Sequence, residues 1–157
     1  DPKVRALEGL PSVVDVKAGD VPERIEVHEG AIRFEVDVRH GQKTGLFLDQ
    51  RENHLVAGQY ASGEALDAFA YHGGFALQMA GRCSRVDALD GSEPAIEALR
   101  VNAARNGLTN VEARVANVFD ELRELEISKT RFDTIVLDPP AFAKTKVTLP
   151  KALGGYK

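Results

Sequence analysis

The segment from residue 64 to residue 80 constrains the fold of this chain more than any other. Residues 65–69 are small or apolar apart from Asp67, which is typical of a buried strand, and the adjacent Gly73 and Gly74 interrupt this pattern before a short helix. A strand that turns through glycine into a helix brings backbone N–H groups and a helix N-terminus to one end of a sheet. The segment therefore predicts a site for an anionic or nucleotide-like ligand.

Short strands alternate with helices from this segment to residue 137. We expect strands at 65–69, 85–89, 111–115 and 132–137, and helices at 75–80, 93–106 and 118–125. The clearest helix has Ser92 as its cap, Pro94 in its first turn and Gly107 after its end. This alternation predicts an α/β fold with a parallel sheet.

The N-terminal part has a different periodicity. Apolar residues alternate with polar ones over residues 25–38, which predicts a small antiparallel hairpin with a turn near Gly30. Asp49 is placed to cap a helix at about residues 50–60. We expect the buried face of this helix to include Leu55 and Val56, and its outer face Arg51, Glu52 and His54.

Four features stand where the four strands of the parallel sheet end. In chain order they are the loop 70–74, Asp90, Asn117 and the run Asp138-Pro139-Pro140-Ala141-Phe142. Open α/β sheets bind ligands at the carboxyl ends of their strands. There Asp90 is suited to accept hydrogen bonds from ribose hydroxyls, and Asn117 to hold an adenine edge.

Each feature also has a purely structural alternative. Paired glycines often form a tight turn, an aspartate before Gly91 often opens a helix, and Asn117 can be only an N-cap. The Asp-Pro-Pro loop is harder to explain in this way, because two prolines fix φ and remove two donors just where a sheet meets its ligand. A dinucleotide-binding domain is disfavoured, because Phe69 and Tyr71 stand where its glycines would recur.

Three segments together resemble one known family. They are QKTGLFLDQREN at residues 42–53, LDAFAYHGGF at 66–75 and DPPAF at 138–142. They are similar to S-adenosylmethionine-dependent methyltransferases of 23S ribosomal RNA that make 5-methylcytidine, and the likeness covers roughly residues 25–157. The resemblance implies a Rossmann-like class I methyltransferase fold, with its parallel strands in the order 3-2-1-4, and S-adenosylmethionine as cofactor. This order leaves the fourth strand as an exposed apolar edge. Residues 1–48 would be a linker and the end of a central β-rich domain, and residues 49–157 the N-terminal part of the methyltransferase domain.

The resemblance also assigns site residues by position. The cofactor-binding residues would be Phe47, Asp49, Gln50, Arg51, Phe69, Ala70, Tyr71, Gly73, Gly74, Asp90, Asn117, Val118 and Asp138. Asp138, Pro139 and Pro140 would face the target base. Apart from the resemblance, Lys144 and Lys146 follow this loop in a stretch without acidic residues, which favours contact with RNA phosphates, although a solvated face is an equal alternative. Phe142 would stack on an RNA base or only pack under the loop. Family members often have serine in place of Ala70 and threonine in place of His72, which removes one hydroxyl from the expected cofactor contacts.

The implied chemistry is covalent, because a cytosine carbon is a poor nucleophile until a cysteine thiolate adds to C6. The one cysteine, Cys83, lies between the first helix and the second strand of the α/β part, away from the binding loops. The family carries its nucleophile in a motif after the residue that matches Tyr156. We therefore expect this chain to hold the cofactor half of the enzyme and to be inactive alone.

Composition limits the remaining choices. The net charge of −4 gives no overall basic field, so RNA contact must be local, and no apolar run is long enough for a membrane span. One cysteine excludes an internal disulfide and favours the cytoplasm. No metal is expected. The alternatives are a methyltransferase acting on a nitrogen of guanine or adenine, or an inactive module that binds S-adenosylmethionine or RNA. The exposed edge strand leaves a homodimer open.

Overall fold

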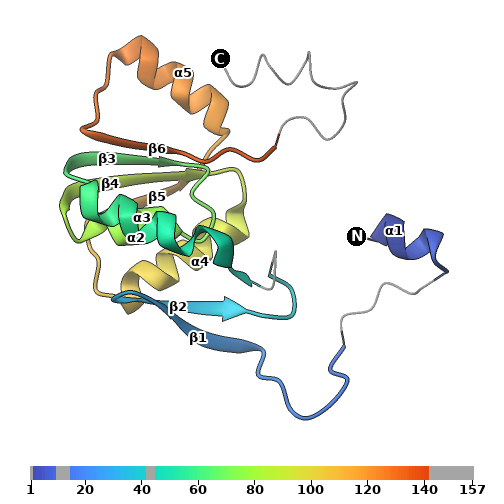
Figure 1. Ribbon diagram of the computed structural model, residues 1–157. Coiled ribbons are helices and arrows are strands. Elements are labelled where there is room, and N and C mark those ends of the chain that lie inside the picture. The colour runs from blue at the N-terminus through green and yellow to red at the C-terminus, as the bar shows by residue number, and fades with distance from the viewer. Residues whose placement is uncertain (1, 10–14, 42–44, 142–157) are drawn as a thin grey trace.

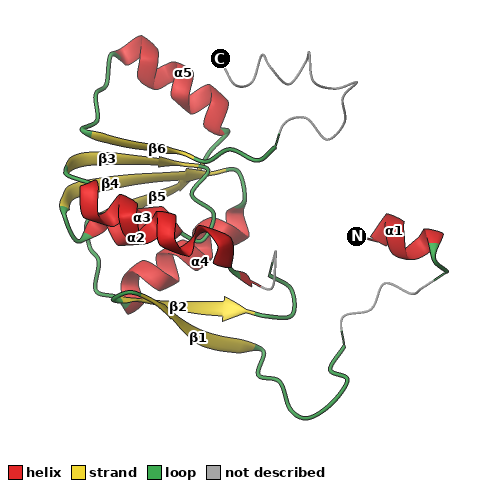
Figure 2. Ribbon diagram, viewed as in Figure 1, coloured by secondary structure: helices red, strands yellow, loops and turns green. Residues whose placement is uncertain are grey.

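The computed structural model describes residues 2–9, 15–41 and 45–141. Its elements in chain order are α1 (Pro2–Leu7), β1 (Arg24–Glu29), β2 (Ile32–Asp37), the short 3-10 helix η2 (Leu48–Gln50), α2 (Arg51–Tyr60), β3 (Gly63–Ala68), α3 (Gly74–Ala80), β4 (Cys83–Asp90), α4 (Glu93–Arg105), β5 (Val111–Val115), α5 (Val118–Ser128) and β6 (Thr134–Leu137). Figure 1 follows this order by colour and Figure 2 separates helices from strands. No helix among these residues is long and apolar enough to cross a membrane.

Four parallel strands form the main sheet in the order β5-β4-β3-β6. This confirms the α/β fold and the expected order 3-2-1-4. β3 lies between β4 and β6, so its end is flanked on both sides by the ends of other strands (Figure 1). β6 pairs only with β3 among the described strands, and its Ile135 and Leu137 are 54% and 57% exposed.

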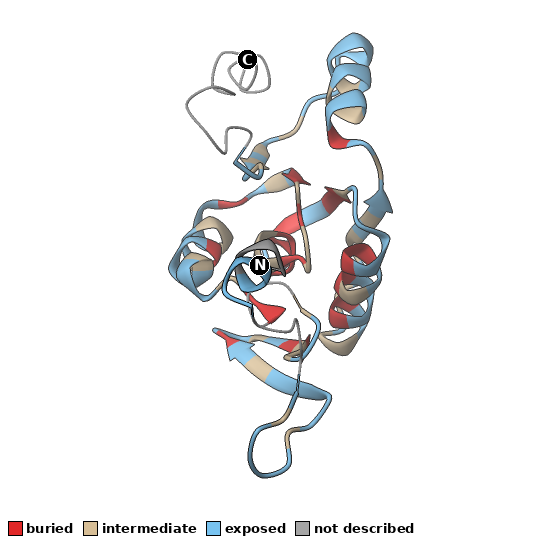
Figure 3. Ribbon diagram, turned by 90° about the vertical axis from the view of Figure 1, so that its right-hand side faces the viewer, coloured by how far each residue is buried: buried red, intermediate tan, exposed pale blue. Residues whose placement is uncertain are grey.

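The core lies mainly on one face of this sheet. Leu77 and Met79 from α3 and Ile96 and Leu99 from α4 pack against small strand residues, and all four are fully buried. The opposite face carries a smaller cluster around Leu66, which includes residues of α5. Figure 3 shows buried residues gathered along the sheet and on the inward sides of α3 and α4.

The predicted antiparallel hairpin is confirmed. β1 pairs with β2 from Arg24↔Asp37 to Glu29↔Ile32, and Gly30 begins the turn with a φ of 59°. The hairpin packs on the α/β part, because buried Phe34 belongs to the same apolar cluster as the α3 and α4 residues. The proposed domain division at residue 48 stays a prediction.

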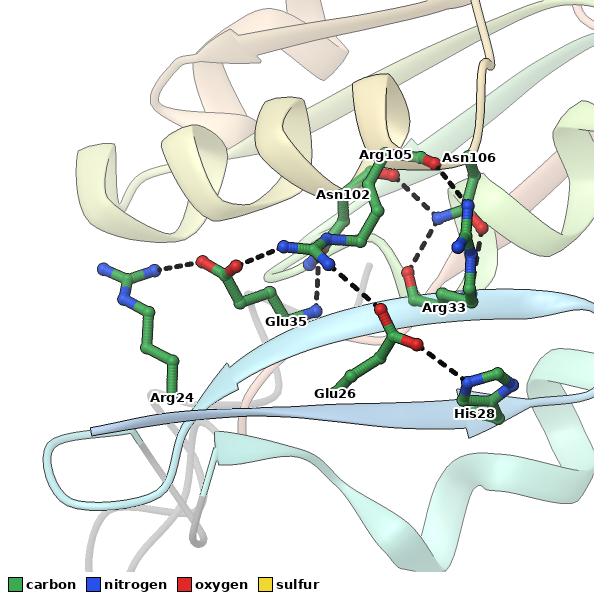
Figure 4. A network of polar contacts seen from close by, with 8 residues as sticks. All are labelled: Arg24, Glu26, His28, Arg33, Glu35, Asn102, Arg105 and Asn106. Carbon is green, nitrogen blue, oxygen red and sulfur yellow. Dashed lines mark hydrogen bonds and ion pairs between the residues drawn. The ribbon is translucent and has the colours of Figure 1, made fainter. Parts of the chain in front are cut away.

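Two asparagine side chains, one from α4 and one from its C-cap, occupy the free edge of β2 (Figure 4). Asn106 Oδ1 accepts from the Arg33 backbone N–H at 2.9 Å and its Nδ2 donates to the Arg33 carbonyl at 2.7 Å, while Asn102 Oδ1 accepts from the Glu35 N–H at 2.8 Å. Asn102 and Asn106 are four residues apart, a rise of about 6 Å along a helix, and Glu35 and Arg33 are two apart, about 6.6 Å along a strand. Each asparagine can therefore reach one of the two strand residues. Arg105 adds an ion pair with Glu35. The two asparagines thus replace a neighbouring strand.

Two expectations for the helix α2 were wrong. α2 is preceded by η2, and its N-cap is Gln50 rather than Asp49. Its buried face is also different, because His54 is 7% exposed whereas Val56 is 47% exposed. A tertiary partner for His54, the buried Glu29, sets the rotation of the helix.

Candidate cofactor site

A cavity of about 1130 Å³ lies at the carboxyl ends of the parallel strands. Five stretches of the chain form its wall: the segment before and within α2, the loop after β3, the segment at the end of β4, the end of β5 with the start of α5, and the run after β6. They contribute Leu46, Phe47, Asp49, Gln50, His54, Phe69, Ala70, Tyr71, His72, Gly74, Phe75, Asp90, Gly91, Ser92, Val115, Ala116, Asn117, Val118, Asp138, Pro139, Pro140 and Ala141. The four features expected at the strand ends therefore meet around one space.

The loop after β3 has an unusual backbone. Phe69, Tyr71 and Gly73 have φ values of 69°, 49° and 85°, in the left-handed region that side chains disfavour. β3 accordingly ends at Ala68, one residue earlier than expected. Phe69 and Tyr71 stand where a dinucleotide-binding domain would have glycines, and their backbone takes the left-handed conformation that glycine favours. Such strain persists where surrounding contacts hold it, and it is common at ligand-binding loops.

Each glycine of this loop faces a different side. A Cβ on Gly73 would lie 2.7 Å from Leu99 Cγ in the core, and a Cβ on Gly74 would lie 2.6 Å from Nε2 of the His54 ring. Gly73 therefore lets α4 approach the loop, and Gly74 lets α2 approach the start of α3. Gly74 lines the cavity, whereas Gly73 does not.

Asp90 joins the end of β4 to this loop. Its Oδ2 accepts from the Tyr71 backbone N–H at 2.9 Å and its Oδ1 from the Ser92 N–H at 2.8 Å. Each carboxylate oxygen can accept more than one hydrogen bond, so capacity remains for ligand hydroxyls. The side chain is placed at the cavity wall and is held there from two directions.

Asn117 acts as the N-cap of α5, since its Oδ1 accepts from the Phe119 N–H at 3.2 Å. The structural alternative for this residue is thus present. It also lines the cavity beside the buried Val118, and the Phe69 and Phe119 rings meet edge to face nearby at 5.6 Å. An amide beside apolar walls is suited to a flat heterocycle.

Polar side chains connect α2 to the Asp-Pro-Pro loop at the other side of the cavity. Gln50 Nε2 donates to Asp138 Oδ2 at 3.4 Å, and Asn53 Nδ2 donates to Gln50 Oε1 at 2.6 Å. Because a carboxylate only accepts, Asp138 fixes which end of the Gln50 amide faces it. The rings of Phe47 and Tyr71 meet edge to face at 5.1 Å and close the same side.

Two titratable groups near the loop are perturbed by burial. Burial raises the pKa of Asp67 to about 7, although the Ala76 N–H donates to its Oδ2 at 2.9 Å and favours the charged form. Its Oδ1 has no partner among the described residues. Burial also lowers the pKa of His72, whose ring stacks on Tyr71 at 3.7 Å. Burial thus favours the neutral form of both side chains.

The structure brings most of the expected cofactor residues to this cavity. The exceptions are Gly73 and Arg51, whose side chain is exposed and pairs with Glu52. Phe142, Lys144 and Lys146 lie outside the described residues. Cys83 is buried at the start of β4, at the opposite end of the sheet. In the described part of the chain, no group of three His, Cys, Asp or Glu side chains is placed to hold a metal ion.

Several lining residues were not among the expected ones: Leu46, His54, Phe75, Gly91, Ser92 and Val115. All of them except His54 lie within two residues of an expected site residue. Including the two neighbours on each side of every expected residue would therefore have found them. His54 carried no such signal. Its approach to the cavity depends on the rotation of α2.

Comparison with known proteins decides the family. A family model for S-adenosylmethionine-dependent methyltransferases matches residues 10–153. The chain belongs to this family. Its whole length is 39% identical to a protein of Pseudoalteromonas atlantica and 39% identical to one of Vibrio cholerae, both named ribosomal RNA large subunit methyltransferase I. It covers only 41% of each relative.

A solved structure agrees with this methyltransferase assignment. A protein assigned as a methyltransferase and crystallised with SAH (S-adenosylhomocysteine) superposes with a TM-score of 0.72 at 28% identity, over 83% of this chain and 36% of that one. The methyltransferase family uses S-adenosylmethionine. The cavity fits that cofactor chemically, with a carboxylate for a ribose at Asp90 and an amide beside apolar walls at Asn117.

Proposed function

We propose that this chain binds S-adenosylmethionine in the cavity and forms the cofactor-binding part of a ribosomal RNA methyltransferase. One observation carries the proposal: the loop after β3, Asp90, Asn117 and the Asp138-Pro-Pro run all line one cavity. The names of the similar proteins support ribosomal RNA of the large subunit as substrate.

The lining of the cavity suggests which part of the cofactor each wall binds. Asp90 accepts hydrogen bonds from the ribose hydroxyls, and Asn117 and Val118 hold the adenine. Phe47, Asp49 and Gln50 surround the methionine part, above a floor made by the loop Phe69–Gly74, whereas the expected role of Arg51 is not supported, because its exposed side chain pairs with Glu52 outside the cavity. When bound, the cofactor supplies an electrophilic methyl group. These residues bind and orient it, so that the methyl group lies in line with its acceptor at near-attack distance, about 3–3.5 Å.

The target proposed is C5 of a cytidine in 23S ribosomal RNA, with Asp138, Pro139 and Pro140 facing the base. This reaction needs a thiolate at C6. Cys83 does not supply it, because it is buried away from the cavity and burial raises the pKa of its thiol. The nucleophile is therefore placed outside this chain, which alone is expected to bind the cofactor without turnover. Methylation of a guanine or adenine nitrogen is less favoured.

We further propose that residues 1–48 are a linker and the end of a central β-rich domain, and that residues 49–157 begin the methyltransferase domain. Phe142, Lys144 and Lys146, which follow the Asp-Pro-Pro loop in sequence, would contact RNA. A cytoplasmic location follows from a ribosomal RNA substrate. A homodimer through β6 is a further proposal, and it is supported by the exposed Ile135 and Leu137.

Calorimetric titration with SAH tests the cofactor site. Wild-type chain is expected to bind, and Asp90→Ala to bind about 10–100-fold more weakly, because charged hydrogen bonds contribute about 1.5–3 kcal/mol each. Asp120→Asn, an exposed carboxylate on α5, is the matched control and should bind as the wild type does. Equal affinity for Asp90→Ala would contradict the ribose assignment.

A second experiment tests the substrate. Nucleosides of 23S ribosomal RNA are compared by mass spectrometry between cells that express the gene and cells that lack it. Loss of 5-methylcytidine supports the carbon target. Loss of a methylated guanosine or adenosine would support the nitrogen alternative, and an unchanged profile would leave a module that only binds.

A further inference from the structure

Glu29 and His54 form a buried pair between the hairpin and α2. Glu29 is the last residue of β1 and is 1% exposed, and His54 is 7% exposed. Glu29 Oε2 lies 2.9 Å from His54 Nδ1. The other carboxylate oxygen of Glu29 has no partner within the described part of the chain. A carboxylate so far from water depends on its partner, so the ring of His54 is held from the hairpin side.

The hairpin tip leaves little free space around this pair. The Glu29 carbonyl accepts from Gln78 Nε2 of α3 at 2.7 Å, and a Cβ on Gly30 would lie 2.7 Å from Leu55 Cδ2. A Cβ on Gly58 of α2 would lie 2.8 Å from the Gln78 carbonyl oxygen. The tip, α2 and α3 are therefore in contact with one another, and the His54 ring cannot move independently of them.

The same ring reaches the cavity. A Cβ on Gly74 would lie 2.6 Å from His54 Nε2, and the Phe75 ring packs edge to face on His54 with centroids 4.5 Å apart. Gly74 and Phe75 begin α3, and His54, Gly74 and Phe75 all line the cavity. Moving the His54 ring would therefore move the point where the cofactor loop enters its helix.

We propose that His54, held by Glu29, is a positioning residue that sets the place of Gly74 and so the affinity of the cavity for S-adenosylmethionine. This inference rests on the cofactor site proposed above. His54 acts through the loop rather than on the reacting atoms. The hairpin then does more than cover the core, because the position of its tip affects cofactor binding through the His54 ring.

A double-mutant cycle tests the contact between ring and loop. SAH affinity is measured for wild type, Gly74→Ala, His54→Ala and the double variant, each well below its melting temperature. Gly74→Ala is expected to weaken binding by at least about tenfold, because its methyl group meets the ring, and His54→Ala by about threefold. The double variant should bind within about threefold of His54→Ala, since the obstructing ring is gone. Gly81→Ala is the control, because a Cβ on Gly81 would meet no atom within 4 Å.

The Glu29 side of the pair is tested by conservative rescue. Glu29→Gln keeps an acceptor for the His54 N–H and should bind SAH nearly as wild type does, whereas Glu29→Ala should not. His28→Ala, an exposed histidine on the same strand, should change nothing. Amide exchange of residues 69–77 without ligand should speed up in Glu29→Ala and His54→Ala only.

The outcomes separate this inference from the cofactor site. If wild type binds SAH and the two penalties of the cycle simply multiply, the positioning role is overturned while the site stands. If variants lose thermal stability but keep wild-type affinity and exchange, the pair is only structural and the inference fails. If wild type does not bind SAH, the cofactor site fails, and unchanged amide exchange would then overturn the positioning role separately. Should Gly74→Ala not fold, the Glu29 variants decide the question.

Discussion

The backbone N–H of Tyr71 donates to Asp90 Oδ2 at 2.9 Å, which fixes the loop after β3 to the end of β4. Tyr71 has a positive φ, so this hydrogen bond helps to hold a conformation that a tyrosine would otherwise avoid. A residue expected to bind the ribose thus also shapes the loop on which the rest of the cofactor would lie.

Replacing Gly73 by alanine should destabilise the fold by about 2–4 kcal/mol. The new Cβ would be strained at a φ of 85° and would meet the side chain of Leu99. Gly107→Ala is the matched control, since it has a φ of 66° but no atom within 4 Å, and should cost about 1 kcal/mol. Urea unfolding measures both. Equal losses would mean that the Leu99 contact adds nothing to backbone strain.

Replacing Asp67 by asparagine should make stability less dependent on pH. Burial raises the folded-state pKa of Asp67 to about 7, above its ordinary 3.8, so the folded chain favours the neutral form. The contribution of Asp67 is therefore complete below about pH 4 and is lost as pH rises to about 7, by up to about 4 kcal/mol.

The measurement for Asp67 is the difference in unfolding free energy between wild type and Asp67→Asn from pH 4 to pH 8. Other titrating groups largely cancel in this difference. Wild type should lose stability relative to the variant up to about pH 7 and then run parallel to it. A difference that stays constant over the whole range would show that Asp67 titrates normally.

Replacing Asn102 by alanine should cost about 1–3 kcal/mol, because the Glu35 backbone N–H would lose its buried acceptor. Glu97→Ala, on the outer face of the same helix, should change stability by no more than about 0.5 kcal/mol. Amide exchange at Glu35 locates the effect in the hairpin. Protection that persists at Glu35 in Asn102→Ala would mean that the asparagine does not close the strand edge.

Replacing Ile135 by lysine should weaken self-association of the chain. Ile135 is 54% exposed and lies on β6, which within the described part of the chain pairs only with β3, and a charge on such an edge opposes strand pairing between copies. Val56→Lys, an exposed apolar position on α2, is the control. Sedimentation velocity compares the variants. A monomeric wild type at high concentration would contradict association through β6.

Much of the fold was predictable because it follows from local periodicity. Apolar runs separated by glycine, proline and caps located β3 to β6, and the family resemblance of three segments implied their order, which the sheet shows. The candidate site was predictable for a related reason. Asp90, Asn117 and Asp138 stand at the end of a strand or within two residues after it, and the ends of parallel strands meet at one edge whatever the packing.

The sequence by itself determined the alternation of strands and helices and the set of strand-end residues around the cavity, because both depend on spacing along the chain. Only the tertiary structure decided that His54 turns inward, that Phe69 and Tyr71 take left-handed backbones, and that asparagines of α4 close the edge of β2. Each of these depends on a partner distant in sequence: Glu29 for His54, Asp90 for the loop and β2 for α4. Such contacts form only when the elements pack together, so they cannot be predicted from local propensity.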